Sequence, residues 1–207
     1  MIELEKFKNI PIESSALQAI MGNYKFPRNK VSALEKRGNI IRLKLGLYVV
    51  SEKISRVPVS RELIANHLCG PSYLSLETAL SFYGMIPERV FAVRSMTTKR
   101  AKNFETPFGN FDYTTVSTAY FGIGLRQEIV EDQYAFLIAT PTKAICDMIV
   151  ATPYLRLQSV KAIHNYLTED LRIDFDDLKN LNKNIVEQCV EVGKKKNELK
   201  QLLKFLE

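Results

Sequence analysis

The spacing of apolar residues along this chain changes from helical to strand-like and back to helical, and this restricts the fold class. Helical spacing predicts helices over residues 60–68 and 75–83, and again from 140 to a stop before Pro153 and over 158–168, 174–192 and 195–206. Between them, aromatic and β-branched residues predict strands at 90–98, 109–116, 119–123 and 134–139. Separate runs of strands and helices are typical of α+β proteins. We therefore expect an α+β fold, with a small antiparallel sheet followed by C-terminal helices.

The positive charge of the chain is confined to its first part. Residues 1–56 carry 11 basic and 5 acidic residues, an excess of six, whereas the other 151 residues carry 18 of each sign. A local excess of this kind is the electrostatic footprint of a polyanion site, although a solvated basic surface is the simpler alternative. The asymmetry predicts a basic domain over residues 1–56 and a neutral domain over residues 57–207, and we expect each to fold by itself.

Two short helices are expected within the basic segment. Residues 12–22 show a helical apolar face, and Ser14 or Ser15 can cap the N-terminus. A second helix is expected to begin at Pro27 and to end at Gly38, because proline suits the first turn and glycine the stop. The apolar face of the first helix consists of Ala16, Leu17, Ile20 and Met21.

The second helix is expected to have one apolar and one polar side. At about 100° per residue, Val31 and Leu34 point to one side. The opposite side carries Arg28, Asn29, Ser32 and Lys36, whose side chains can bond base edges and phosphates, and a helix fits the major groove.

A hairpin is expected to follow this helix. Ile41 and Leu43 alternate with Arg42 and Lys44, residues 45–46 can turn, and residues 47–50 return as a strand. Helix, turn, helix and hairpin in this order predict a winged helix-turn-helix domain that binds double-stranded DNA. A helical subdomain that docks on the rest of the protein is the alternative. The expected DNA-binding residues are Lys25, Arg28, Asn29, Lys30, Ser32, Lys36, Arg37, Arg42 and Lys44.

The sequence offers no pattern typical of a cofactor, metal or membrane site. Cys69, Cys146 and Cys189 lie far apart in apolar or helical stretches, which favours reduced thiols. His67 and His164 each lie among Leu and Ile on an expected helix and are interpreted as core-edge residues. No stretch reaches the roughly 18 apolar residues of a membrane span, and residues 1–8 lack the apolar core of a signal peptide. We expect a cytoplasmic protein without a bound cofactor.

Several motifs, taken in order, resemble the AbiEi-type antitoxins, which are transcriptional regulators of abortive-infection toxin–antitoxin systems. The segment RLKLGLYV at 42–49 is similar to that family's wing. The longest resembling stretch is GPSYLSLETALSFYGMIPE at 70–88. It is followed by MTTKR at 96–100, GNFDY at 109–113 and ATPTKAICD at 139–147. The resemblance covers residues 12–150, and it departs from the family at Thr142, where a glutamate is common. The chain therefore has a threonine and no acidic residue directly before Lys143.

The resemblance implies a function in two parts. The winged helix would bind inverted repeats in its own promoter, as a homodimer on the DNA, and repress its operon. The second domain would counteract a nucleotidyltransferase-like toxin encoded next door.

Two other classes of function stay open at this point. One is a DNA-targeted enzyme, such as a nuclease with a winged-helix arm, which would need clustered carboxylates to hold Mg²⁺. Acidic residues in the expected strands are sparse, and residues 174, 176 and 177 are instead typical of a helix start. We therefore expect no catalytic residues. The other class is a nucleic-acid-binding or interaction adaptor, whose basic N-terminus binds RNA or an acidic protein.

Overall fold

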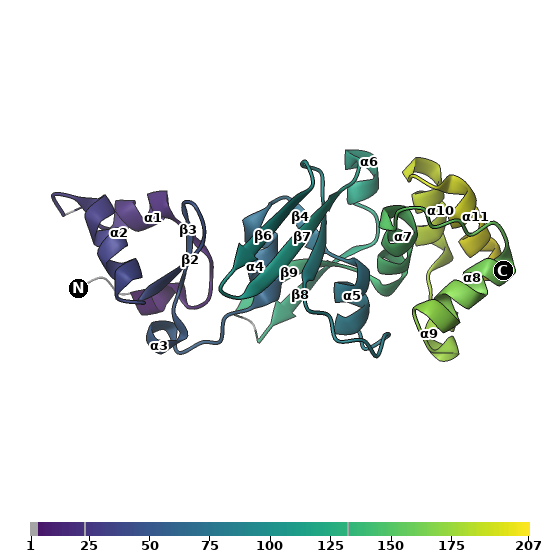
Figure 1. Ribbon diagram of the computed structural model, residues 1–207, viewed down its shortest axis with the longest axis horizontal. Coiled ribbons are helices and arrows are strands. Elements are labelled where there is room, and N and C mark those ends of the chain that lie inside the picture. Colours follow the sequence, from purple (N-terminus) through teal and green to yellow (C-terminus); the bar gives the residue numbers. More distant parts are fainter. Residues whose placement is uncertain (1–3, 23, 132) are drawn as a thin grey trace.

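The computed structural model describes residues 4–22, 24–131 and 133–207 and has an α+β fold. Eleven α-helices and two β-sheets are present in these ranges (Figure 1). The N-terminal elements lie at one end of an elongated molecule, the larger sheet lies in the middle, and the C-terminal helices lie at the other end (Figure 1). The α+β class expected from the sequence is confirmed.

The N-terminal unit, residues 4–56, contains a three-stranded sheet and two helices of more than one turn. The strands β1, β2 and β3 are antiparallel in the order β1-β3-β2, so that the hairpin expected over residues 39–50 is confirmed. In chain order the elements are the 3₁₀ turn η1 (Leu4–Phe7), β1 (Ile12–Glu13), α1 (Ser14–Ile20), α2 (Pro27–Lys36), β2 (Ile40–Lys44), β3 (Leu47–Val50) and α3 (Glu52–Ser55).

The apolar face expected for the first helix is only partly correct. Leu17 and Met21 are fully buried, but Ala16 is exposed and Ile20 keeps 49% of its surface. The buried stripe is narrow because α1 has only seven residues and packs on α2 along one side. The serine cap is also wrong, since Glu13 occupies the N-cap position and makes no side-chain capping bond.

The N-terminal unit has a small core of its own, yet its sheet is covered on both faces. The residues of the small core are Leu4, Ile12, Leu17, Met21, Val31, Leu34, Ile40, Tyr48 and Val50. On the other face of the sheet, Leu43, Leu47 and Val49 belong to the core of the larger domain. The hairpin therefore joins two hydrophobic cores.

The larger domain is built on a six-stranded mixed sheet with the strand order β6-β7-β5-β4-β9-β8. The pairs β4–β9 and β5–β7 are parallel, and the other neighbouring strands are antiparallel. The strands are β4 (Ser72–Leu74), β5 (Val93–Thr97), β6 (Lys102–Thr106), β7 (Gly109–Thr115), β8 (Leu125–Val130) and β9 (Tyr134–Ala139).

The expectation of a four-stranded antiparallel sheet was wrong in three respects. The sheet is mixed, and β4, β6 and β8 were missed because β4 has three residues and the edge strands β6 and β8 are rich in polar residues. The strand expected at 119–123 is instead a helix, α6 (Thr118–Phe121). Its start is stabilised by Ser117, whose hydroxyl accepts a hydrogen bond from the Tyr120 N–H.

Two helices expected beside the sheet are confirmed. Ser60 caps α4 (Arg61–Leu68) by accepting a hydrogen bond from the Leu63 N–H at 3.1 Å. After α5 (Leu76–Phe82), Gly84 adopts the left-handed conformation expected of a helix stop.

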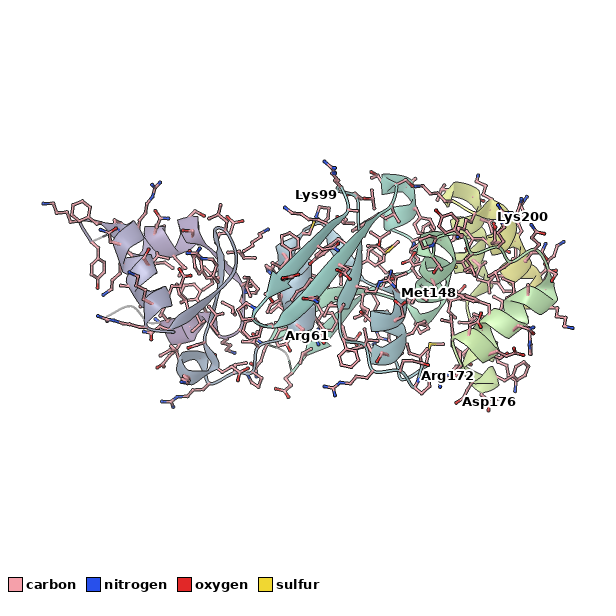
Figure 2. The ribbon with its side chains drawn as sticks, viewed as in Figure 1. Arg61, Lys99, Met148, Arg172, Asp176 and Lys200 are labelled. Atoms are coloured by element: carbon pink, nitrogen blue, oxygen red, sulfur yellow. The ribbon has the colours of Figure 1, made fainter. Side chains whose placement is uncertain are left out.

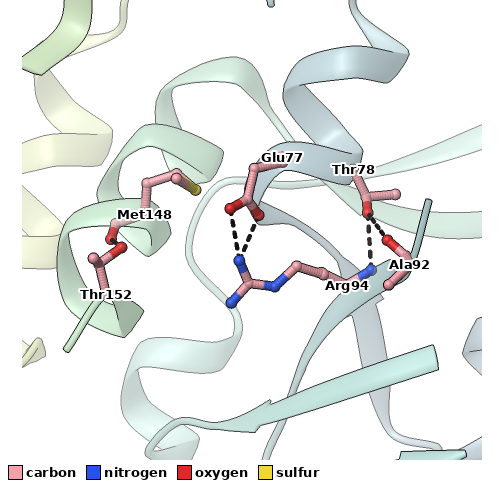
Figure 3. Close-up of polar contacts among 6 residues, drawn as sticks. All are labelled: Glu77, Thr78, Ala92, Arg94, Met148 and Thr152. Carbon is pink, nitrogen blue, oxygen red and sulfur yellow. Dashed lines mark hydrogen bonds and ion pairs between the residues drawn. The ribbon is translucent and has the colours of Figure 1, made fainter. Parts of the chain in front are cut away.

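Side-chain bonds attach α5 to β5. The Arg94 guanidinium donates to both carboxylate oxygens of Glu77, at 2.6 and 2.7 Å, and the Arg94 N–H donates to the Thr78 hydroxyl (Figure 3). This contact fixes the start of the helix beside the strand.

The C-terminal part is helical, but one expected helix is divided in two. Between α9 and α10, the Asn182 side chain caps the new helix by accepting from the Asn184 N–H, and the Asn182 N–H donates to the Thr142 hydroxyl. The single helix expected over 174–192 is therefore wrong. The helices here are α7 (Pro141–Ala151), α8 (Val160–Asn165), α9 (Phe175–Lys179), α10 (Lys183–Val192) and α11 (Lys196–Phe205), with a π-helical turn η2 (Tyr166–Asp170) after α8.

An ion pair lies fully inside the larger domain. Lys143 and Asp147, one turn apart on α7, have no exposed side-chain surface and are joined by a 3.0 Å contact from Nζ to Oδ1. The Ser75 hydroxyl donates to the other Asp147 oxygen at 2.6 Å, and Lys143 Nζ donates to the Tyr120 carbonyl at 3.2 Å. The pair thus connects α7 with the β4–α5 junction and with α6.

Three further observations concern the sequence expectations. All three cysteines are free and buried. Both histidines are exposed, not at the core edge, and His67 bonds the Leu63 carbonyl within its own helix. Within the described ranges, no helix combines the length and apolar character needed to cross a membrane.

Candidate nucleic-acid interface

The helix α2 begins and ends at residues suited to those positions. Pro27 stands in the first turn, where its missing N–H leaves no helical bond unmade. At the other end the Gly38 N–H donates to the Glu35 carbonyl and the Asn39 N–H donates to the Leu34 carbonyl. Gly38 has a φ of +69°, so this is the left-handed stop that the sequence predicts.

The two sides of α2 differ as the apolar spacing predicts. Val31 and Leu34 are buried in the small core. The side turned away from the core is exposed to solvent along the helix and carries Arg28, Asn29, Ser32 and Lys36. The structure therefore brings these four side chains together on one accessible helix face.

Two exposed aromatic residues extend this face beyond the start of α2. Tyr24 and Phe26 keep 43% and 62% of their surface exposed. Lys30 Nζ lies 4.9 Å from the centre of the Tyr24 ring, and Lys25 Nζ lies 5.6 Å from that of Phe26. Aromatic rings beside cations can stack on bases or pack against sugars. The sequence-based prediction used only the basic residues here, although the alternation of aromatic and basic residues at 24–26 was a usable signal.

The charges around α2 are largely uncompensated. In the ranges that the structure describes, Lys25, Arg28, Lys30, Lys36 and Arg37 form no ion pair with a carboxylate. These cations therefore stay free to contact phosphates.

The only acidic residue of α2 is neutralised from the hairpin. The Arg42 guanidinium donates to the Glu35 carboxylate at 2.7 Å and lies 5.7 Å from the centre of the Tyr48 ring. The bond to Glu35 raises the pKa of the Arg42 guanidinium. Arg42 thus removes the repulsion that Glu35 would exert on a phosphate, while its own side chain stays half-exposed.

Lys44, also expected in the DNA-binding set, points to the larger domain. Its Nζ donates to the Leu68 carbonyl at 2.6 Å and lies 5.7 Å from the centre of the Phe104 ring. The register between β2 and β3 shifts between Arg42 and Lys44, and such a bulge turns the following side chain to a new direction. Strict alternation along β2 could not reveal this shift. Lys44 therefore lies apart from the α2 face.

The structure contains no arrangement that would bind a metal among the described residues. No group of three or more His, Cys, Asp or Glu side chains gathers there. The acidic residues Asp176 and Asp177 lie in the first turn of α9, as the sequence predicts for a helix start.

Neither a protein-family model nor a curated protein sequence matches this chain. The resemblance to a known family therefore rests on the sequence motifs alone. The evidence for a binding surface is the arrangement of side chains on α2.

Proposed function

We propose that this protein is a DNA-binding transcriptional regulator whose N-terminal unit is a winged helix-turn-helix domain and whose α2 is the recognition helix. The chain order of α1, α2 and the β2–β3 hairpin supports this, as does the short strand β1 completing the sheet. In such domains the second helix of the motif enters the major groove. The proposed division into residues 1–56 and 57–207 corresponds to the two hydrophobic cores except at the hairpin, where Leu43, Leu47 and Val49 belong to the larger core.

One observation carries the proposal: α2 presents an exposed polar and basic face that is free of carboxylate partners in the described ranges. Arg and Asn are the side chains that read guanine and adenine edges, and Arg28 and Asn29 lie in the first turn, where base contacts are usually made. Lys25, Lys30, Lys36 and Arg37 flank them and supply phosphate contacts. We include Ser32 and Arg42 in the proposed surface and leave out Lys44.

The regulatory role is proposed from the motif resemblance. In this proposal the protein is an AbiEi-type antitoxin in the cytoplasm, binds an inverted-repeat operator as a pair, and represses its own operon. The neutral larger domain would counteract a nucleotidyltransferase-like toxin. Within the resembling segment 139–147, Lys143 and Asp147 are fully buried, so these two motif residues support packing and are not contact residues.

DNA binding is tested by fluorescence anisotropy on a duplex of the gene's own upstream region and on a random duplex. We expect Arg28→Ala and Asn29→Ala to weaken specific binding by about 1–3 kcal/mol and random binding much less, because base contacts discriminate sequence. Lys25→Ala is expected to weaken both and to reduce the salt slope by about one unit.

Two controls remove a lysine outside the surface. Lys200 lies on α11 at the opposite end of the molecule (Figure 2), and Lys44 faces the larger domain. Lys200→Ala and Lys44→Ala are expected to leave the salt slope unchanged. Equal losses for Lys200→Ala and Lys25→Ala would mean that the positive charge beside α2 has no special role in DNA binding.

The antitoxin role is tested by co-expressing the full chain with the product of the adjacent gene, from a foreign promoter. We expect the Arg28→Ala variant to suppress toxicity as well as the unaltered chain does, because the two roles are assigned to different domains. Failure of this variant, with its abundance unchanged, would make DNA binding itself the antidote.

A further inference from the structure

A cavity of about 550 Å³ lies between the N-terminal unit and the larger domain. Its walls come from the end of α2, from β2, from the junction of β3 and α3, and from Phe108 in the β6–β7 turn. The volume is in the range of small-molecule sites, which are frequent between domains. None of the surface proposed for DNA recognition lines it except Arg37.

One wall of the cavity holds a buried hydroxyl without a partner. Ser51 is only 5% exposed, and its Oγ makes no hydrogen bond within the described residues. The backbone N–H of Ser51 donates to the Asn39 carbonyl at 2.9 Å, so the residue is fixed in place. The Oγ atom is itself covered by protein, so Ser51 forms a fixed part of the cavity wall.

The charged groups of the cavity favour an anion. Arg37 and Lys53 contribute two positive charges, and neither forms an ion pair in the ranges described. The wall contains one carboxylate, that of Glu52, and one of its oxygens is already bonded by the Val59 N–H at 2.9 Å.

The remaining wall is apolar. Ile41, Ile54 and Phe108 are partly buried and face the same cavity. Phe108 packs against the large core, whereas Ile54 packs against the small core. An apolar or aromatic body placed here would contact both parts of the protein.

We propose that this cavity binds a small molecule that carries a phosphate or carboxylate group on an aromatic ring. Arg37 and Lys53 bind the anionic group, and the ring packs on Phe108 and the two isoleucines. Such a ligand bridges the two cores and stabilises the folded chain by binding it and not the unfolded state. The site does not depend on DNA binding, since it is formed by the folded chain alone.

The test is a titration of the full chain, followed by ¹H–¹⁵N NMR, with phenyl phosphate and with benzoate. The two probes distinguish phosphate from carboxylate as the preferred group. We expect at least one of them to give saturable shifts at the amides of residues 38–39, 51–54 and 108. Inorganic phosphate and benzyl alcohol, which each lack half of the ligand, are expected to bind at least about tenfold more weakly.

Two variants connect the binding to the cavity. Lys53→Gln and Phe108→Leu are each expected to weaken binding of the better probe by about tenfold. Lys200→Gln, a matched loss of one surface charge, is expected to leave affinity unchanged, and the amide spectrum of each variant shows whether it is folded.

Non-saturating shifts spread over the basic surface with both probes would overturn the proposal. The proposal would also be overturned if the folded Lys53→Gln and Phe108→Leu variants bound the probe as tightly as the unaltered chain does.

Discussion

The N-terminal unit and the larger domain place their charged residues in opposite ways. The N-terminal unit keeps several cations exposed on and beside α2, where water solvates them and a polyanion can reach them. The larger domain has balanced charge and buries Lys143 and Asp147 completely. A solvated charge contributes little to stability and is free for binding, whereas a buried pair is bound to its partners and determines packing. The surface of the N-terminal unit is therefore suited to recognition, whereas the buried charges of the larger domain serve its packing.

The hairpin β2–β3 belongs to both regions, because it packs on both hydrophobic cores. One face of the β2–β3 hairpin covers the small core, and the other contributes Leu43, Leu47 and Val49 to the large core. The net charge of the chain therefore changes at the boundary after residue 56, whereas the two hydrophobic cores share the hairpin across this boundary.

The largest effect is expected from cutting the chain after residue 56. The fragment would expose Leu43, Leu47 and Val49, and each fully buried aliphatic side chain contributes about 1.5–3 kcal/mol. We expect the fragment of residues 1–56 to be mostly unfolded by circular dichroism, contrary to the sequence-based expectation that each part folds alone. Replacing these three residues with Thr, Gln and Thr in the fragment tests whether their exposure to water causes the unfolding. A fragment that folds cooperatively without these changes would show that the small core suffices.

The next largest effect is expected at the buried ion pair. Asp147→Asn leaves the Lys143 charge without its carboxylate, and breaking a buried pair in this way costs about 3–5 kcal/mol. The free energy of unfolding is measured by urea titration. The double variant Lys143→Met with Asp147→Leu removes both charges and is expected to recover part of the loss.

The matched control for this pair is the half-exposed contact between Arg94 and Glu77 (Figure 3). Glu77→Gln is expected to cost about 0–1 kcal/mol, since water solvates the arginine that is left. Similar losses at the two sites would remove the distinction between buried and surface charge.

A smaller effect is expected from alkaline pH, and it concerns the larger domain. Burial raises the pKa of Tyr73, Tyr113 and Tyr120, and it raises the pKa of Tyr166 to about 12. A raised pKa means that the folded state binds the phenol proton more tightly than the unfolded state, in which the tyrosine pKa is about 10. The contribution of these tyrosines to the free energy of unfolding is therefore fully present below about pH 10. It is lost as the pH rises from about 10 through the higher pKa values of the folded state.

The measurement is the free energy of unfolding against pH, together with tyrosinate absorbance. Tyr166→Phe is expected to reduce the decline between pH 10 and 12 by roughly 2–3 kcal/mol. Tyr24→Phe, at an exposed position of the N-terminal unit, serves as the control and is expected to leave the decline unchanged. Tyrosinate forming near pH 10 at Tyr166 without unfolding would contradict the assignment.

Local features of the fold could be predicted from the sequence because they depend on neighbours along the chain. The two sides of α2, its stop at Gly38, the cap at Ser60 and the hairpin all follow from spacing and from residue type at helix ends. The candidate surface shares this property, since Arg28, Asn29, Ser32 and Lys36 lie within three turns of one helix. The edge strands could not be predicted, because their pairing is with distant segments and their own pattern is polar.

The sequence by itself determined the excess of positive charge in residues 1–56, the helix that presents it and the α+β class. Tertiary structure alone decided the parallel pairing of β4 with β9, the direction of Lys44 after a shift in register, and the contact of Ser75 with Asp147. The physical reason is the range of the interactions. Periodicity and capping act over one or two turns, but the bond from Ser75 to Asp147 joins residues 72 positions apart, which only the packed chain brings together.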